Sequence, residues 1–164
     1  MKRRRLGLLA VVTCSLTIGT TSLFPLRAVA APDGLSAATN QELALARMAT
    51  VQYHDVEQAI ADGYLEEVYT SGEGFEYINF GLIDCVFDPE QPEVLHYIPS
   101  GNGLRLVGVE YVVPTACTAT PPEGFAGDED EWSPEPPLPI WRLNAWLWFG
   151  NPDGMFVEAH PLIP

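Results

Sequence analysis

The chain has 164 residues, about the length of one ordinary domain, and carries 8 basic against 22 acidic residues, a formal net charge of −14. The basic residues are unevenly placed, because five of them lie within the first 27 positions. From residue 31 onward three arginines stand against all 22 acids, so this part of the chain carries a charge of −19. A body of this charge repels phosphate groups, which argues against nucleic-acid binding and against electrostatic docking on an anionic membrane.

The first thirty residues have the three parts of a secretory signal peptide. Residues 1–5 are basic, residues 6–26 are uncharged and largely apolar, and Ala28-Val29-Ala30 supplies the small residues of a cleavage site before Ala31. An uncleaved membrane anchor is the alternative, since the apolar stretch is about 20 residues long. Its serines and threonines and Pro25 favour cleavage near Ala30/Ala31. We therefore expect a secreted protein with a single domain over residues 31–164 and no membrane association after cleavage.

Two cysteines, Cys85 and Cys117, remain after this cleavage. In an exported protein an even pair favours a disulfide, which would close a loop of about 33 residues and contribute roughly 3–4 kcal/mol. Two separate buried thiols are the alternative. A metal site on these cysteines is not expected, because the sequence lacks a C-x-x-C spacing and a nearby histidine pair.

The first element expected after the signal peptide is one long helix. Thr39-Asn40-Gln41-Glu42 fits a capping box, and apolar residues recur at helical spacing as far as Ile60. Asp62-Gly63 ends the pattern, with Gly63 suited to a left-handed position after the last turn. The spacing predicts a helix of about 22 residues with one apolar face lying on a sheet.

Strand patterns follow the helix. Residues 75–83 are aromatic and β-branched, and residues 94–98 and 104–113 flank a Pro-Ser-Gly-Asn-Gly turn, which predicts a hairpin. Residues 143–149 form a fourth run and residues 155–159 a short fifth. The order predicts an α+β fold of two layers, one long N-terminal helix packed on an antiparallel sheet of four to five strands.

The segment 114–139 stands apart because it contains seven prolines and six acids and shows no strand or helix period. A solvated flexible loop is the simplest interpretation. A lid, or a weak calcium-binding loop at Asp128-Glu129-Asp130-Glu131, is the alternative.

Alternation in the later strands indicates a ligand-binding face. It places Asn144, Trp146 and Trp148 on the side of their strand opposite Leu143, and Glu110 on the side of its strand shared by Leu106. Because one helix can cover only one sheet face, the second face would carry aromatic side chains and a few polar groups, as ligand sites do. The alternative is a second core layer covered by residues 114–139 through Trp132.

Several phrases resemble a family of small exported bacterial proteins of unknown function. They are Ala61-Asp62-Gly63-Tyr64, Pro92-Glu93-Val94-Leu95-His96-Tyr97, Leu106-Val107-Gly108-Val109-Glu110-Tyr111-Val112-Val113-Pro114, and Trp146-Leu147-Trp148 followed by Asn151-Pro152-Asp153-Gly154-Met155-Phe156. The resemblance names no activity. It implies that relatives often carry histidine where this chain has Glu76 and Asn144, which puts metal binding or histidine-based catalysis in doubt for this chain. Both positions can still coordinate or form hydrogen bonds.

The sequence contains no familiar catalytic motif, so function is predicted from the expected ligand face. The leading hypothesis is a secreted, non-catalytic domain that binds a small molecule or an extracellular partner, without a cofactor. Its candidate ligand-binding residues are Glu76, Tyr77, Glu110, Asn144, Trp146, Trp148 and His160, with Tyr111 adding to the aromatic face. One alternative is a small extracellular acid–base or metal-dependent enzyme that uses Glu76, Glu110 and His160 in the same pocket, with a divalent metal. The other is a structural acidic domain without a ligand.

Overall fold

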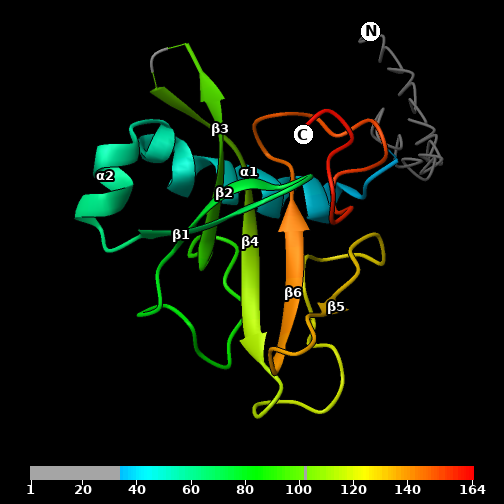
Figure 1. Cartoon of the computed structure of the whole chain (residues 1–164). Helices are drawn as coiled ribbons and strands as arrows, with labels where there is room; N and C mark the ends of the chain where they lie inside the picture. The colour runs from blue at the N-terminus through cyan, green and yellow to red at the C-terminus, as the bar shows by residue number, and fades with distance from the viewer. Residues whose placement is uncertain (1–33, 102) are drawn as a thin grey trace, which may run out of the picture.

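A computed structural model describes residues 34–101 and 103–164, so the predicted signal peptide lies outside the described residues. The fold is α+β, as expected. In chain order the elements are α1 (Ala37–Thr50), the 3-10 helix η1 (Val51–His54), α2 (Val56–Ala61), β1 (Leu65–Thr70), β2 (Gly74–Ile78), β3 (Val94–Ser100), β4 (Gly103–Pro114), β5 (Ser133–Pro134) and β6 (Ile140–Ala145). All paired neighbours are antiparallel in a six-stranded sheet of order β1-β2-β3-β4-β6-β5 (Figure 1).

The prediction of one long helix is wrong, because the helical region is divided into three pieces. Asp55 adopts an extended conformation, and its side chain accepts a hydrogen bond from the backbone N–H of Glu57, which starts α2. The first helix begins earlier than expected, with Ser36 rather than Thr39 as its N-cap. Gly63 does follow the last turn with a positive φ of 99°. No helix within the described ranges combines the length and hydropathy of a membrane-crossing segment.

The hairpin of β3 and β4 is confirmed, whereas the other strands differ from the expectation. Two strands were missed: β1 at the exposed edge of the sheet and the two-residue β5 inside the proline-rich segment. The run expected over 75–83 ends at Ile78, and residues 155–159 form turns. The run expected over 143–149 ends at Ala145, where a tight turn brings the Leu147 N–H to the Ala145 carbonyl. Trp146 and Trp148 therefore lie beyond the strand.

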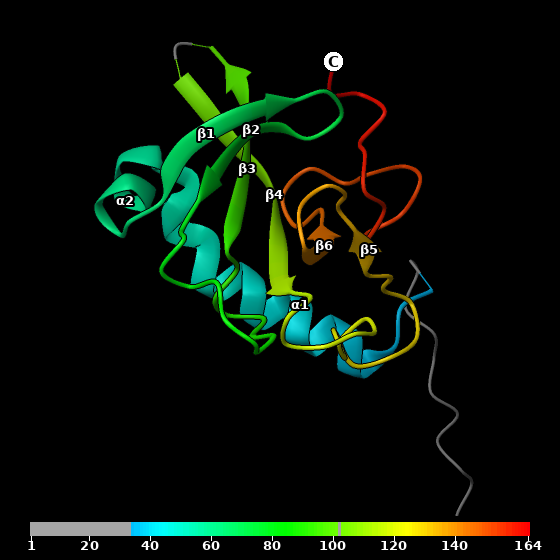
Figure 2. The ribbon, with the colours of Figure 1, turned by 60° about the horizontal axis from the view of Figure 1, so that its bottom comes forward.

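The first helix covers one face of the sheet, and Figure 2 shows it lying across the strands. The main core on this side contains Leu43 and Ala46 of α1 together with tyrosines and aliphatic residues of the strands. The segment after β4 runs beside the start of α1 (Figure 2), where the Ala126 N–H donates to Glu42. Phe125 and Trp132 of this segment also pack into the helix-side core, so Trp132 does not cover the second face.

A β-bulge in β4 changes which side chains share a face. The register pairs His96 with Gly108 and Tyr97 with Leu106, which leaves Val107 between two paired residues. Because one extra residue reverses the alternation, Leu106 joins the helix-side core and Val107 packs against Trp146 in a separate cluster. The expectation that Leu106 shares a face with Glu110 is thus wrong.

The predicted disulfide between Cys85 and Cys117 is confirmed, with a Cα–Cα distance of 5.4 Å. It joins the connection between β2 and β3 to the turn that follows β4. Across that turn the Thr115 N–H donates to the Pro139 carbonyl at 2.8 Å. These links hold three separate loops together at one end of the sheet.

Candidate functional site

The face of the sheet opposite α1 carries a row of buried polar residues, one from each of four strands. Glu76 of β2 pairs with His96 of β3, and Glu110 of β4 pairs with Asn144 of β6. The bulge in β4 allows His96 and Glu110 to lie on one face, with the His96 Nε2 atom 3.5 Å from the Glu110 Oε2 atom. Each of the four side chains is at most 9% exposed. Burying an ionisable group without a partner reduces the stability of the folded state, so such a row is unusual in a purely structural sheet.

Arg142 of β6 supplies the positive charge of this cluster. Its Nη2 atom donates to Oε1 of Glu73, in the turn between β1 and β2, at 2.5 Å. Its Nη1 atom lies 3.7 Å from Oε2 of Glu110. On the more exposed side, Arg142 also pairs with Glu135 and Glu158. One buried guanidinium thus faces four carboxylates from four different parts of the chain.

Several polar atoms of the cluster have no hydrogen-bond partner among the described residues. They are Oε2 of Glu73, both ring nitrogens of His96, Oε2 of Glu110, Nε of Arg142 and Oδ1 of Asn144. Native proteins satisfy nearly all buried polar atoms, and a group of exceptions at one place calls for an explanation. One explanation is that these atoms form hydrogen bonds with a bound ligand.

The electrostatics of the cluster favour bound protons or bound cations. Burial raises the pKa of the Glu73 carboxyl, and Arg142 only partly offsets this effect. Burial alone would lower the pKa of the His96 imidazole, but the adjacent Glu110 and the charges of Glu73 and Glu76 outweigh it and raise the pKa. Burial would likewise lower the pKa of Arg142, which the surrounding carboxylates raise instead. The cluster therefore behaves as a site of excess negative charge.

A cavity of about 450 Å³ opens above these residues. Most of its wall is apolar, and its polar residues are Thr70, Glu73, Glu76, Glu110, Glu135, Arg142 and Glu158. The apolar wall residues are Val68, Ile78, Phe80, Ile83, Val94, Val112, Leu138, Pro139 and Ile140. An apolar wall with a few convergent polar groups is the usual composition of a small-molecule site.

The sequence-predicted residues divide between the two faces. Glu76, Glu110 and Asn144 lie together at the cavity side, and Trp146 stacks against His96 with ring centroids 5.9 Å apart. Tyr77 and Trp148 belong to the helix-side core, where Tyr77 contacts the ring of Tyr97. The Trp148 indole N–H donates to Thr50 of α1. The aromatic face expected from strand alternation is therefore not assembled, because Tyr77 alternates with Glu76 in β2 and faces the helix, and because β6 ends before Trp148.

His160 lies beside the cluster but is engaged elsewhere. It is completely buried, its Nδ1 atom accepts from the Leu162 N–H, and its Nε2 atom lies 3.2 Å from the Gly150 carbonyl. Its ring stacks on Phe149 and meets the edge of Trp146. These contacts describe a histidine that fixes the C-terminal segment.

Sequence reasoning missed Glu73, His96 and Arg142. For His96 the sequence showed only its alternation with Val94 and Ile98 in the predicted strand, because the bulge at Val107 is what brings it to the side of Glu110. Glu73 lies in a glycine-containing turn, and Arg142 precedes the expected start of its strand. Neither position carried a pattern that pointed to the cavity.

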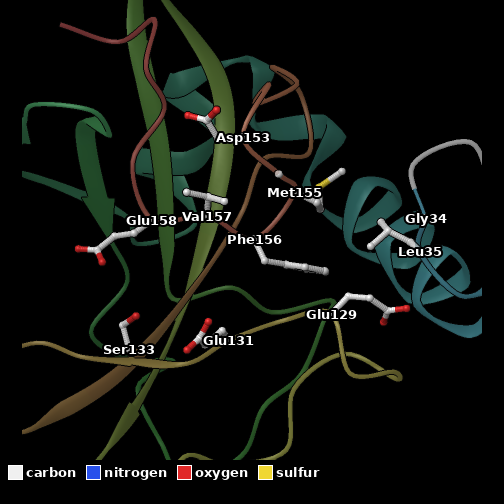
Figure 3. Close-up of a pocket in the computed structure, with 11 residues that line it drawn as sticks. Gly34, Leu35, Glu129, Glu131, Ser133, Asp153, Met155, Phe156, Val157 and Glu158 are labelled. Atoms are coloured by element: carbon white, nitrogen blue, oxygen red, sulfur yellow. The ribbon is translucent and has the colours of Figure 1, made fainter.

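A second hollow, of about 480 Å³, is acidic but lacks such convergence. Its acidic residues are Glu129, Glu131, Asp153 and Glu158, and Figure 3 shows their carboxylates pointing in different directions. Glu129 is occupied by hydrogen bonds from Ser36 and Thr39 at the start of α1. The acidic loop thus serves partly as a helix contact, and the cavity above Glu110 is the stronger site.

Comparisons of the chain with protein-family models, with curated proteins and with solved structures gave no match. The interpretation of the site therefore rests on its geometry and chemistry.

Proposed function

We propose that the protein is a secreted, non-catalytic binding protein whose cavity takes a small molecule with an apolar body and a polar head. The observation that carries the proposal is the apolar-walled cavity of about 450 Å³, whose floor has carboxylate oxygens of Glu73 and Glu110 without a hydrogen bond to the described residues. Secretion is supported by the signal-peptide pattern of residues 1–30 and by the disulfide, which persists in oxidising compartments.

The rim of the cavity supports a ligand site independently of its floor. Val68, Phe80 and Leu138 are large apolar side chains between 48% and 56% exposed, and all three line the opening. They come from β1, from the β2–β3 connection and from the segment before β6. Apolar side chains gathered around one opening favour an interaction site over a plain solvated surface.

The proposal can be tested with N-phenyl-1-naphthylamine, an uncharged probe whose fluorescence increases in apolar surroundings. We expect saturable binding of one probe per chain. The double substitution Phe80→Ser and Leu138→Ser should weaken the probe affinity at least tenfold, because it removes apolar contacts from two sides of the opening. Both residues are largely exposed, so the fold should be retained.

A matched control is the double substitution Met48→Ser and Leu162→Ser, which removes two apolar side chains that are more exposed than Phe80 and Leu138 and lie outside the cavity. Its probe affinity should equal that of the unmodified protein. Absence of saturable binding, or equal loss in both double variants, would contradict the proposal and favour a structural domain without a ligand.

The enzymatic alternative has less support. The histidine assigned to it, His160, has both ring nitrogens in contact with backbone atoms. The geometry instead offers His96 and Glu110 as neighbours, with His96 completely buried.

A further inference from the structure

We propose that Glu73, His96 and Glu110 form a binding site for one divalent transition-metal ion of the zinc class. One ligand atom from each residue lies within 4.8 Å of the other two, and all three residues are buried. The proposal goes beyond the small-molecule function and does not depend on it, since the three residues would hold the ion whether or not the cavity above takes an organic ligand.

Unpartnered atoms identify this cluster as more than a group of acids. Oε2 of Glu73, Oε2 of Glu110 and both ring nitrogens of His96 have no hydrogen-bond partner among the described residues. Exposed fractions of 3%, 3% and 0% leave these residues almost no access to solvent. Oε2 of Glu110 has longer ion-pair contacts, at 3.5 Å to Nε2 of His96 and 3.7 Å to Arg142. Buried ligand atoms that lie this close together and form no hydrogen bond to the described residues have the arrangement of metal ligands.

The charge of the buried group agrees with a divalent ion. Glu73, Glu76 and Glu110 contribute three negative charges and Arg142 one positive charge, all at 9% exposure or less. With a neutral imidazole the group therefore has an excess of two negative charges. A divalent ion would neutralise this excess without requiring the carboxylates to take up protons.

Neighbouring residues hold the three ligands in orientation, as outer contacts of metal sites commonly do. Arg142 occupies Oε1 of Glu73 and leaves Oε2 available. The ring of Trp146 stacks on His96 at an angle of 29°, which restricts rotation of the imidazole. Asn144 donates to the Glu158 carbonyl at 2.7 Å, and its own Oδ1 atom remains as a further oxygen beside Glu110.

The ligand types select the class of metal. One imidazole nitrogen and two carboxylate oxygens suit Zn²⁺ and related ions such as Co²⁺, whereas Ca²⁺ and Mg²⁺ require more oxygen ligands. Three protein ligands would leave a coordination position toward the cavity. A ligand in the cavity could then contact the ion directly.

The first test is equilibrium dialysis of the secreted chain, after chelator treatment, against Zn²⁺, Co²⁺ or Mg²⁺. We expect one zinc or cobalt ion per chain and no stoichiometric magnesium. Glu110→Gln should weaken zinc affinity at least 100-fold, whereas Glu131→Gln, in the acidic hollow of Figure 3, should leave it unchanged. Loss of zinc without loss of fold, checked by circular dichroism, supports the site.

A second test uses the unmodified protein and remains valid if the variants fail to fold. The chain contains three histidines, His54, His96 and His160. On addition of one equivalent of Zn²⁺, the ring ¹⁵N resonances of His96 alone should shift by tens of ppm. Absence of stoichiometric zinc, a shift at the exposed His54 instead, or unchanged affinity in folded Glu110→Gln would overturn the proposal. Binding of N-phenyl-1-naphthylamine without zinc binding would reject only the metal site and leave the small-molecule function standing.

Discussion

Arg142 donates to Glu73 at 2.5 Å although the two residues are 69 positions apart in the chain. The contact joins β6 to the turn between β1 and β2, and hence two strands on opposite sides of the β3–β4 hairpin. Because Arg142 also faces Glu110, it is the cation that makes burial of two carboxylates possible. The stability of the sheet and the charge of the cavity floor therefore depend on the same side chain.

Replacing Arg142 by methionine should strongly destabilise the fold. The substitution keeps an unbranched apolar stem but leaves Glu73 and Glu110 without their buried counter-charge, a loss that typically costs about 3–5 kcal/mol. Urea unfolding at neutral pH would measure the difference. Arg105→Met is the control, because Arg105 is exposed, and its guanidinium donates to the Trp148 carbonyl and lies over the Phe149 ring. Equal losses of less than about 1 kcal/mol in both variants would contradict this role.

Glu93 should make stability depend on pH. Burial raises the pKa of its carboxyl to about 8, although the Val112 N–H donates to it at 2.9 Å, and the charges of Asp84 and Glu110 add to the increase. Between the ordinary value of 4.5 and about 8, the folded chain keeps a proton that the unfolded chain has released. The folded state binds more protons in this range, so the free energy of unfolding falls as pH rises, by roughly 1 kcal/mol per pH unit.

Glu93→Gln should remove this contribution, since the amide keeps a hydrogen-bond acceptor but does not titrate. Unfolding by urea at pH 5, 6, 7 and 8, with a chelator present, gives the comparison. The free energy of unfolding of the variant, relative to that of the unmodified protein, should rise steadily from pH 5 to pH 8. The exposed Glu67→Gln serves as control, and a Glu93→Gln curve parallel to that of the unmodified protein would show that Glu93 carries no extra proton.

The disulfide should matter for the cavity as well as for stability. One wall contains Phe80 and Ile83, which precede Cys85, and the other contains Pro139, which accepts from Thr115 near Cys117. Replacing both cysteines by serine should lower the free energy of unfolding by about 3 kcal/mol. It should also weaken N-phenyl-1-naphthylamine binding in the fraction that stays folded at low temperature. Unchanged probe affinity would mean that other contacts hold the two walls in place.

Local patterns were sufficient for the hairpin and for the disulfide. The β3–β4 hairpin has β-branched runs on both sides of a turn of glycine, asparagine and proline, so short-range chemistry alone specifies it. The helix was predicted as continuous because apolar spacing does not end at Asp55. The helix is interrupted because the Asp55 side chain accepts a hydrogen bond from the Glu57 N–H and starts a new helix there. The spacing of apolar residues gives no information about such a local cap.

The site was predictable only where it follows strand alternation. Glu76, Glu110 and Asn144 lie on one face because each is part of a regular paired stretch. The ring of Trp146 reaches the same cluster by a turn after β6, and Arg142 meets Glu73 through folding of distant segments. Such contacts are set by the register of the whole sheet, in which the bulge at Val107 decides whether His96 and Glu110 share a face.

Gly108 should be required for the contact between His96 and Trp146. A Cβ atom added at this position would lie 3.1 Å from the Ala145 carbonyl oxygen and 3.1 Å from the Trp146 ring. Ala145 is held by its pairing with Val109, and the Trp146 ring is held by its indole N–H, which donates to the Val157 carbonyl at 2.6 Å. Gly108→Ala should therefore shift the indole, reduce stability by about 1–3 kcal/mol and alter the near-ultraviolet circular dichroism of the tryptophans.

The matched control for Gly108→Ala is Gly103→Ala, which lies in the same strand but would meet nothing within 4 Å. Its stability should change by no more than about 0.5 kcal/mol. If the imidazole of His96 is a metal ligand held by Trp146, Gly108→Ala should also weaken zinc binding, while Gly103→Ala should not. Equal stability and equal zinc affinity in the two variants would show that the backbone at Ala145 shifts at little cost in free energy. They would also show that Trp146 does not orient His96.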